Sequence, residues 1–127
     1  MSALVLDAGA LIAVDRNDRA MLARLRAAER HGLALRSNAM VVAQVWRDSR
    51  GRQSGLARLL QAVDVRAVDH EAGRAAGVLL ARAGTADAID ATVVLLAQPG
   101  DRIVTGDPDD LTLLASAAAS RARIVAC

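Results

Sequence analysis

Carboxylates recur at three places where an apolar stretch of the sequence gives way to a turn or a helix. Asp7 directly follows the apolar run at residues 4–6, which reads as a buried strand. Asp87 and Asp90 open an apolar helical stretch, and Asp107 follows a short predicted strand at residues 102–105. Functional groups in open α/β sheets gather at the carboxyl ends of the strands. The pattern therefore predicts that these carboxylates form one cluster.

The acidic residues of this cluster differ in how far a purely structural role explains them. Asp87 and Asp90 are three positions apart, so their side chains share one face of a helix, and N-capping accounts for only one of them. Asp107 lies in a Gly- and Pro-containing turn, which is also a common way to present a metal ligand at a strand end. Asp109 and Asp110 are expected to cap the helix that follows.

The residue types around the cluster indicate a hard cation. The chain has two His and a single Cys, Cys127, so the ligands would be oxygens, which favours Mg²⁺ or Mn²⁺ over Zn²⁺. Ions held by few carboxylates keep bound waters and meet substrate phosphates, and the matching chemistry is phosphodiester hydrolysis. The sequence contains no P-loop, no dinucleotide-binding fingerprint and no serine nucleophile elbow.

The elements that must position these side chains alternate between strand and helix patterns. This alternation predicts an α/β fold with a mostly parallel central sheet, formed by residues 1–127 as a single domain. We expect Met40 to be buried on its helix and the helix at 70–83 to pack on the sheet. The expected strands are 4–6, 33–36, 63–68, 102–105 and 123–126, and the main expected helices are 19–30, 39–46, 56–61, 70–83, 87–98 and 109–119.

The amino-acid composition limits the kinds of molecule that the chain is expected to bind. The formal net charge is +2, and every Lys-or-Arg position is Arg, a side chain suited to bidentate phosphate contacts. Trp46 is the only aromatic residue, which argues against binding single strands by stacking bases on several aromatic side chains. No apolar run is long enough for a membrane span, and no signal peptide is recognisable. We expect a cytoplasmic protein, because its lone Cys cannot form an internal disulfide.

Four stretches, in this order and spacing, resemble the PIN-domain ribonucleases of the VapC toxin type, from bacterial type II toxin–antitoxin pairs. The resemblance implies a three-layer α/β/α sandwich, Mg²⁺- or Mn²⁺-dependent cleavage of RNA, a homodimer and neutralisation by a small cognate antitoxin. It makes Asp7, Asp107 and the Asp87/Asp90 pair the catalytic metal carboxylates, with Asp90 preferred as the direct ligand and Thr105 orienting the site. The matching stretches are residues 4–12, 42–47, 87–91 and 104–111.

The chain departs from that family at Gln44, where the family has Glu. An amide keeps a coordinating oxygen but loses the charge, so an alternative is a catalytically weakened domain that mainly binds antitoxin or RNA. Arg47, Arg50 and Arg52 follow this helix in a polar loop and are candidates for RNA contact, although a solvated connector also explains the loop.

Two other classes that place Asp at strand ends fit less well. Receiver domains need an acidic pair after the first strand and a Lys, and the chain has no Lys. Haloacid-dehalogenase-type hydrolases need Asp-x-Asp after the first strand, where this chain has Asp7, Ala8 and Gly9.

Overall fold

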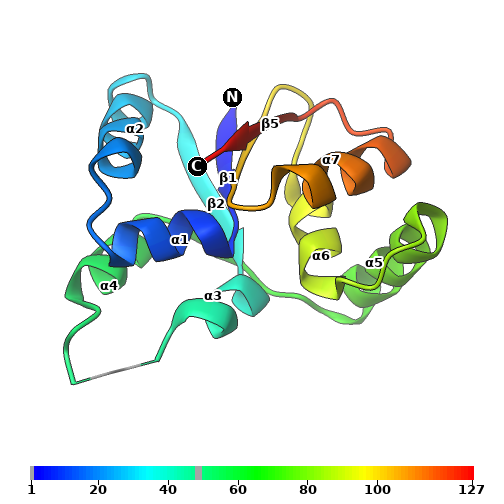
Figure 1. The fold of residues 1–127 in the computed structure, drawn as a ribbon, viewed down its shortest axis with the longest axis horizontal. Coiled ribbons are helices and arrows are strands. Elements are labelled where there is room, and N and C mark those ends of the chain that lie inside the picture. The colour runs from blue at the N-terminus through cyan, green and yellow to red at the C-terminus, as the bar shows by residue number, and fades with distance from the viewer. Residues whose placement is uncertain (1, 48–49) are drawn as a thin grey trace.

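A computed structural model describes residues 2–47 and 50–127. Its described part contains a five-stranded sheet in the order β3-β2-β1-β4-β5, in which every neighbouring pair is parallel (Figure 1). The predicted α/β class with a parallel sheet is confirmed. The strands are β1 (Ala3–Leu6), β2 (Ala34–Asn38), β3 (Asp64–Arg66), β4 (Arg102–Thr105) and β5 (Arg123–Ala126).

Helices cover both faces of the sheet and make three layers. Because connections between parallel strands are right-handed, helices on the path β1 to β3 lie on one face and those on the path β3 to β5 on the other. Figure 1 shows α1, α2 and α4 on one side of the strands and α5, α6 and α7 on the other. The helices are α1 (Ala8–Asp15), α2 (Arg19–Arg30), α3 (Ala39–Val45), α4 (Ser54–Leu60), α5 (His70–Ala83), α6 (Ala88–Leu96) and α7 (Pro108–Ala117).

The strand order reverses between β1 and β4. The chain leaves β1 toward β2 and leaves β4 toward β5, so the two connections diverge and open a crevice at the carboxyl ends of these strands. Asp7 directly follows β1, and Thr105 is the last residue of β4. The topology therefore brings two segments almost one hundred residues apart to one place.

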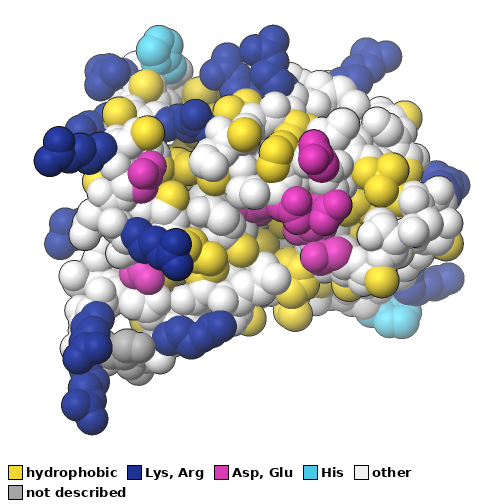
Figure 2. Space-filling view, in the orientation of Figure 1, with side chains coloured by type: hydrophobic (Ala, Val, Ile, Leu, Met, Phe, Trp, Pro, Cys, Tyr) yellow, Lys and Arg dark blue, Asp and Glu magenta, His cyan; other side chains and the backbone are white. Residues whose placement is uncertain are grey.

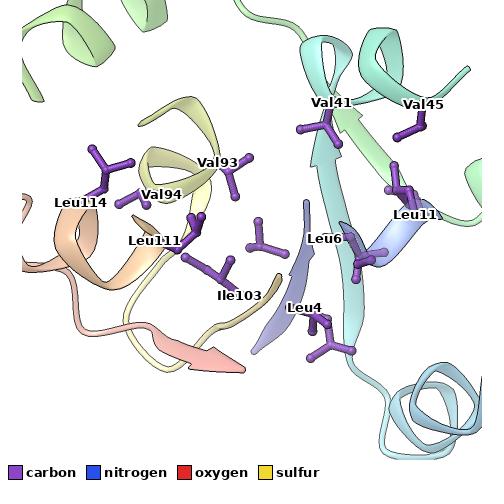
Figure 3. Packing of buried hydrophobic residues seen from close by; sticks show 14 of the residues in the cluster. Leu4, Leu6, Leu11, Val41, Val45, Val93, Val94, Ile103, Leu111 and Leu114 are labelled. Atoms are coloured by element: carbon purple, nitrogen blue, oxygen red, sulfur yellow. The ribbon is translucent and has the colours of Figure 1, made fainter. Parts of the chain in front are cut away.

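The hydrophobic core lies on both faces of the central strands. Val5, Ile103 and Val104 are fully buried, as expected for strands covered on both sides. Figure 3 shows Val93, Val94, Leu111 and Leu114 packed on one side of β1 and Leu11, Val41 and Val45 on the other.

A buried carboxylate, Asp101, lies just before β4, near the amino-terminal ends of the central strands. It is 1% exposed, and it accepts hydrogen bonds from the backbone N–H groups of Ala3 and Gln98, both at 2.8 Å. Arg36 on β2 forms an ion pair with it at 3.5 Å. Asp101 therefore ties β1, β2 and the end of the α6–β4 connection together, away from the crevice.

Two packing predictions are wrong. The helix predicted at 70–83 has the expected bounds, but it packs mainly against α6 and α7 and not on the sheet, because α6 already occupies that face beside β1 and β2. Met40 is 42% exposed, since α3 buries the face that carries Val41 and Val45 and Met40 is turned away from it. The strand predicted at 63–68 is shorter, at Asp64–Arg66.

Among the described residues, the helices are all too short or too polar to cross a membrane.

Candidate metal centre

Asp7 is held on several sides at the end of β1. The residue is 5% exposed. Its Oδ1 accepts a hydrogen bond from the backbone N–H of Ala10 at 3.1 Å, which caps α1. Its Oδ2 accepts a hydrogen bond from the hydroxyl of Thr105, which is fully buried. The same hydroxyl accepts from the N–H of Asp107 at 2.9 Å. Thr105 thus links the two predicted carboxylates and orients Asp7.

Three carboxylates from α6 and the start of α7 converge beside Asp7. Asp90 is half-buried in the first turn of α6, Asp107 precedes α7, and Asp110 lies in the first turn of α7. One oxygen from each of these three carboxylates lies within 4.8 Å of the other two. Figure 2 shows acidic side chains gathered on this face, where α6 and α7 lie next to each other.

Asp110 was not among the metal carboxylates that the sequence predicted. It was expected to cap the helix that follows, and in the structure its carboxylate lies with those of Asp90 and Asp107. The signal was present in the sequence: Asp107 and Asp110 are three positions apart, the same spacing that pairs Asp87 with Asp90. Asp109, one position earlier, is exposed and not part of this group.

Asp87 and Asp90 have different roles. Asp87 is the exposed N-cap of α6, and its Oδ1 accepts from the backbone N–H of Asp90 at 3.0 Å. Of this pair, Asp90 is therefore the one whose carboxylate lies with Asp107 and Asp110, while Asp87 adds negative charge nearby.

The electrostatics of the centre are those of crowded like charges. Burial, followed by the charge of Asp87 and then those of Asp7, Asp107 and Asp110, raises the pKa of Asp90 to about 7. A hydrogen bond with the Asp110 side chain is the main cause that raises the pKa of Asp107. In the described part of the chain, ion pairs involve Asp64 or Asp101 and none of these carboxylates. The negative charge is therefore uncompensated by protein cations.

The donor set fits a hard divalent cation. Oxygens of Asp90, Asp107 and Asp110 are close enough to share one ion, and their chemistry suits Mg²⁺ or Mn²⁺. Burial raises the pKa of Asp7 as well, and its charge acts on both Asp90 and Asp107. A cation would replace repulsion among these groups by attraction.

Two glycines, Gly9 and Gly106, allow two backbone segments beside the site to touch. A Cβ atom on Gly9 would lie 2.6 Å from the backbone nitrogen of Gly106 and 2.7 Å from its Cα. The first turn of α1 and the loop that leads into α7 are therefore in direct backbone contact. This contact joins the segments that carry Asp7 and Asp107, and it could not be read from the sequence.

The other predicted site residues lie on α3 and the loop after it. Gln44 is exposed on α3. The Arg47 guanidinium donates to the carbonyls of Ala43 (3.1 Å) and Trp46 (2.8 Å), where it satisfies the end of α3. Arg50 and Arg52 are exposed, and on the face seen in Figures 1 and 2 their loop lies apart from the acidic side chains.

No protein-family model matches the sequence, and no curated protein matches it. The structure matches a chain of the crystal structure of VapBC2 from Rickettsia felis bound to a DNA fragment from the promoter. The TM-score is 0.72, the match covers 100% of this chain and 99% of that chain, and the sequences are 12% identical. The likeness establishes the fold: the chain has a PIN-like α/β/α architecture, as the sequence predicted.

Proposed function

We propose that residues 1–127 form a single PIN-like domain that cleaves RNA endonucleolytically with Mg²⁺ or Mn²⁺ and acts as a toxin. The observation that carries this proposal is the convergence of Asp90, Asp107 and Asp110 within 4.8 Å. These carboxylates lie beside the buried Asp7 at the point where the strand order of a PIN-like sheet reverses. No protein cation neutralises them in the described residues.

Each residue has a definite part in this proposal. Asp90, Asp107 and Asp110 would hold the ion, with Asp7 completing the site and Thr105 keeping the Asp7 carboxylate oriented. When bound, a divalent cation supplies hydroxide near neutral pH and stabilises charge on the phosphate. The acidic side chains otherwise repel a phosphodiester, so they bring substrate into position only with the ion bound.

The proposed partners follow from the same fold. The matched structure is a VapBC2 bound to promoter DNA, and the sequence resembles VapC-type toxins. We therefore propose a small cognate antitoxin as partner, a homodimer, and a cytoplasmic tRNA, rRNA or mRNA as substrate.

The decisive experiment is cleavage of total tRNA and rRNA by the purified protein in Mn²⁺, in Mg²⁺ or in EDTA. An Asp7→Asn variant runs beside it to exclude a contaminating nuclease. We expect cutting that needs the ion and disappears in the variant. Cutting that continues unchanged in EDTA or in Asp7→Asn would refute the proposed function.

A second candidate is a weakened domain that binds antitoxin or RNA without efficient cleavage. The observation that favours it is Gln44, which offers an amide where the resembling family has a carboxylate. Gln44→Glu separates the two candidates, because the residue is exposed and the substitution preserves its size. A large gain in cleavage would support the weakened domain, whereas unchanged cleavage would support an active native site.

A further inference from the structure

A recess runs along α1, from the residues next to Asp7 and Asp107 to the end of the helix. One end is formed by Gly9 and Gly106, the pair whose backbones touch. Gly106 lies between Thr105 and Asp107, so this end directly adjoins the proposed catalytic groups. The recess has a volume of about 310 Å³.

The wall of the recess on the α1 side is aliphatic. Ile12 and Ala13 contribute half-buried side chains from α1. Cys127 forms the other wall, and its backbone N–H donates to the carbonyl of Thr105 at 2.9 Å, which anchors the end of the chain beside β4. Figure 1 shows this end of the chain close to α1 and to the loop that leads into α7.

The far end of the recess carries a cation, Arg16, at the end of α1. Arg16 is exposed, and within the described residues it takes part in no ion pair. It is seven helical positions beyond Gly9, about 10 Å at 1.5 Å per residue. The neighbouring Asp18 also lines the recess, but its Oδ2 already accepts from the backbone N–H of Met21 at 2.9 Å.

This arrangement favours a nucleotide over other occupants. The Arg16 guanidinium forms no ion pair with a described residue. Such a group suits a phosphate, which it can bind through two parallel hydrogen bonds. The aliphatic wall formed by Ile12 and Ala13 suits a ribose or the face of a base. An RNA strand with one phosphate at the carboxylates would place a flanking nucleotide in the recess, because Gly9 and Gly106 at one end of the recess lie next to Asp7 and Asp107 in the chain.

We propose that this recess, the Arg16 pocket, binds the nucleotide that flanks the scissile phosphodiester of single-stranded RNA, with Arg16 on its phosphate. The pocket rests on the proposed nuclease function and adds the path of the substrate along α1. No aromatic side chain lines the pocket, so binding depends on the phosphate and the sugar and tolerates different bases.

The chain offers a direct reporter of pocket occupancy. Cys127 is its only cysteine, so a thiol-reactive reagent modifies one wall of the pocket and nothing else. Burial raises the pKa of the Cys127 thiol, so labelling is followed in mildly alkaline buffer. The probe is a 2′-O-methyl RNA oligonucleotide of mixed sequence, in which the 2′-hydroxyl groups of RNA are methylated. It is added with Mg²⁺, and its binding is followed by fluorescence anisotropy.

We expect the oligonucleotide to slow Cys127 labelling severalfold. Arg16→Ala should abolish this protection and Arg16→Lys should retain part of it, while Arg19→Ala, a nearby exposed Arg outside the pocket, should leave it intact. Circular dichroism of each variant checks that it is folded.

Two results would overturn the proposal. Bound oligonucleotide with unprotected Cys127, or equal protection in Arg16→Ala, would show that the strand takes another path, even if metal-dependent cleavage is present. Absence of oligonucleotide binding would overturn it too. Absence of cleavage in Mg²⁺ and in Mn²⁺, with protection of Cys127 retained, would instead refute the nuclease function alone and leave the pocket as an RNA-binding site.

Discussion

At the metal centre, neighbouring carboxylates differ in what holds them. Asp7 is buried and fixed by the Thr105 hydroxyl and by its cap on α1, so its position does not depend on a cation. Asp107 and Asp110 are exposed and lie close together at the start of α7, and Asp90 lies half-buried among four like charges. The groups closest to one another are therefore the ones that gain most from a bound ion.

Asp110 should contribute directly to cation affinity. We expect Asp110→Asn to weaken Mn²⁺ binding roughly tenfold or more, since it removes one of three converging ligands. Asp109→Asn removes the same charge from the same helical turn and should have little effect. Isothermal titration with Mn²⁺ measures both variants. Equal losses would mean that net charge alone, and not coordination by Asp110, sets the affinity.

The raised pKa of Asp90 makes the metal-free protein sensitive to pH. Its pKa is about 7 in the folded state, compared with 3.8 for an unperturbed carboxyl. Between these values the folded state holds a proton that the unfolded state has released, so this group stabilises the fold at low pH. That contribution is lost as the pH rises through about 7.

Asp90→Asn should therefore raise the melting temperature in EDTA at mildly alkaline pH and change it little at pH values near the unperturbed pKa. Excess Mg²⁺ should stabilise the native protein more than the variant, because only the native protein binds it fully. Thermal unfolding across the pH range measures this. A variant less stable than the native protein in alkaline EDTA would contradict the expected like-charge repulsion.

At the scale of elements, α1 and the β4–α7 loop meet through Gly9 and Gly106. This backbone contact leaves no room for a side chain and places the N-terminal ends of two helices at one crevice. Helix N-termini carry partial positive charge, which helps to hold carboxylates there. The amino-terminal ends of β1 and β4, at the other end of these strands, are linked by the hydrogen bonds of Asp101.

Gly9→Ala should destabilise the protein by about 1–3 kcal/mol or more, because the added Cβ meets backbone atoms that cannot rotate away. The matched control is Gly77→Ala in the middle of α5, where a Cβ meets nothing within 4 Å. That change should stabilise by about 0.5–1 kcal/mol through helix propensity. Urea unfolding measures both, and a neutral Gly9→Ala would show that the contact relaxes easily.

At the scale of the whole molecule, the charges are segregated. Acidic side chains gather at the crevice, while basic side chains occupy the surrounding surface in Figure 2. The net charge is only +2, so binding of the proposed RNA substrate would depend on where the Arg residues lie and not on their total number.

The triple change of Arg47, Arg50 and Arg52 to Ala tests whether the α3–α4 loop contacts RNA. If all three bind phosphates, the affinity for RNA should fall. The slope of log affinity against log salt concentration should also become shallower by about 2, at about 0.7 per contact with a single strand. Fluorescence anisotropy at several salt concentrations measures this. Unaltered affinity and slope would assign these side chains to the solvated surface.

Local patterns in the sequence determined most of the elements. The helices at 19–30 and 70–83 and the strand at 123–126 have the predicted bounds, because capping residues and apolar periodicity act within a few positions. Asp18 and Asp69 cap their helices as such patterns predict. The strand-to-helix positions of Asp7, Asp90 and Asp107 were likewise readable from the sequence, together with the α/β class.

The tertiary structure alone decided which distant groups meet. Pairing of β1 with β4 brings the Thr105 hydroxyl to Asp7, 98 positions away, and the same pairing makes Gly9 touch Gly106. Asp110 joins Asp90 only because α6 and α7 pack together. Local sequence encodes a residue's place within its own element. Contacts between elements depend on the packing of the whole chain, and that packing builds the centre.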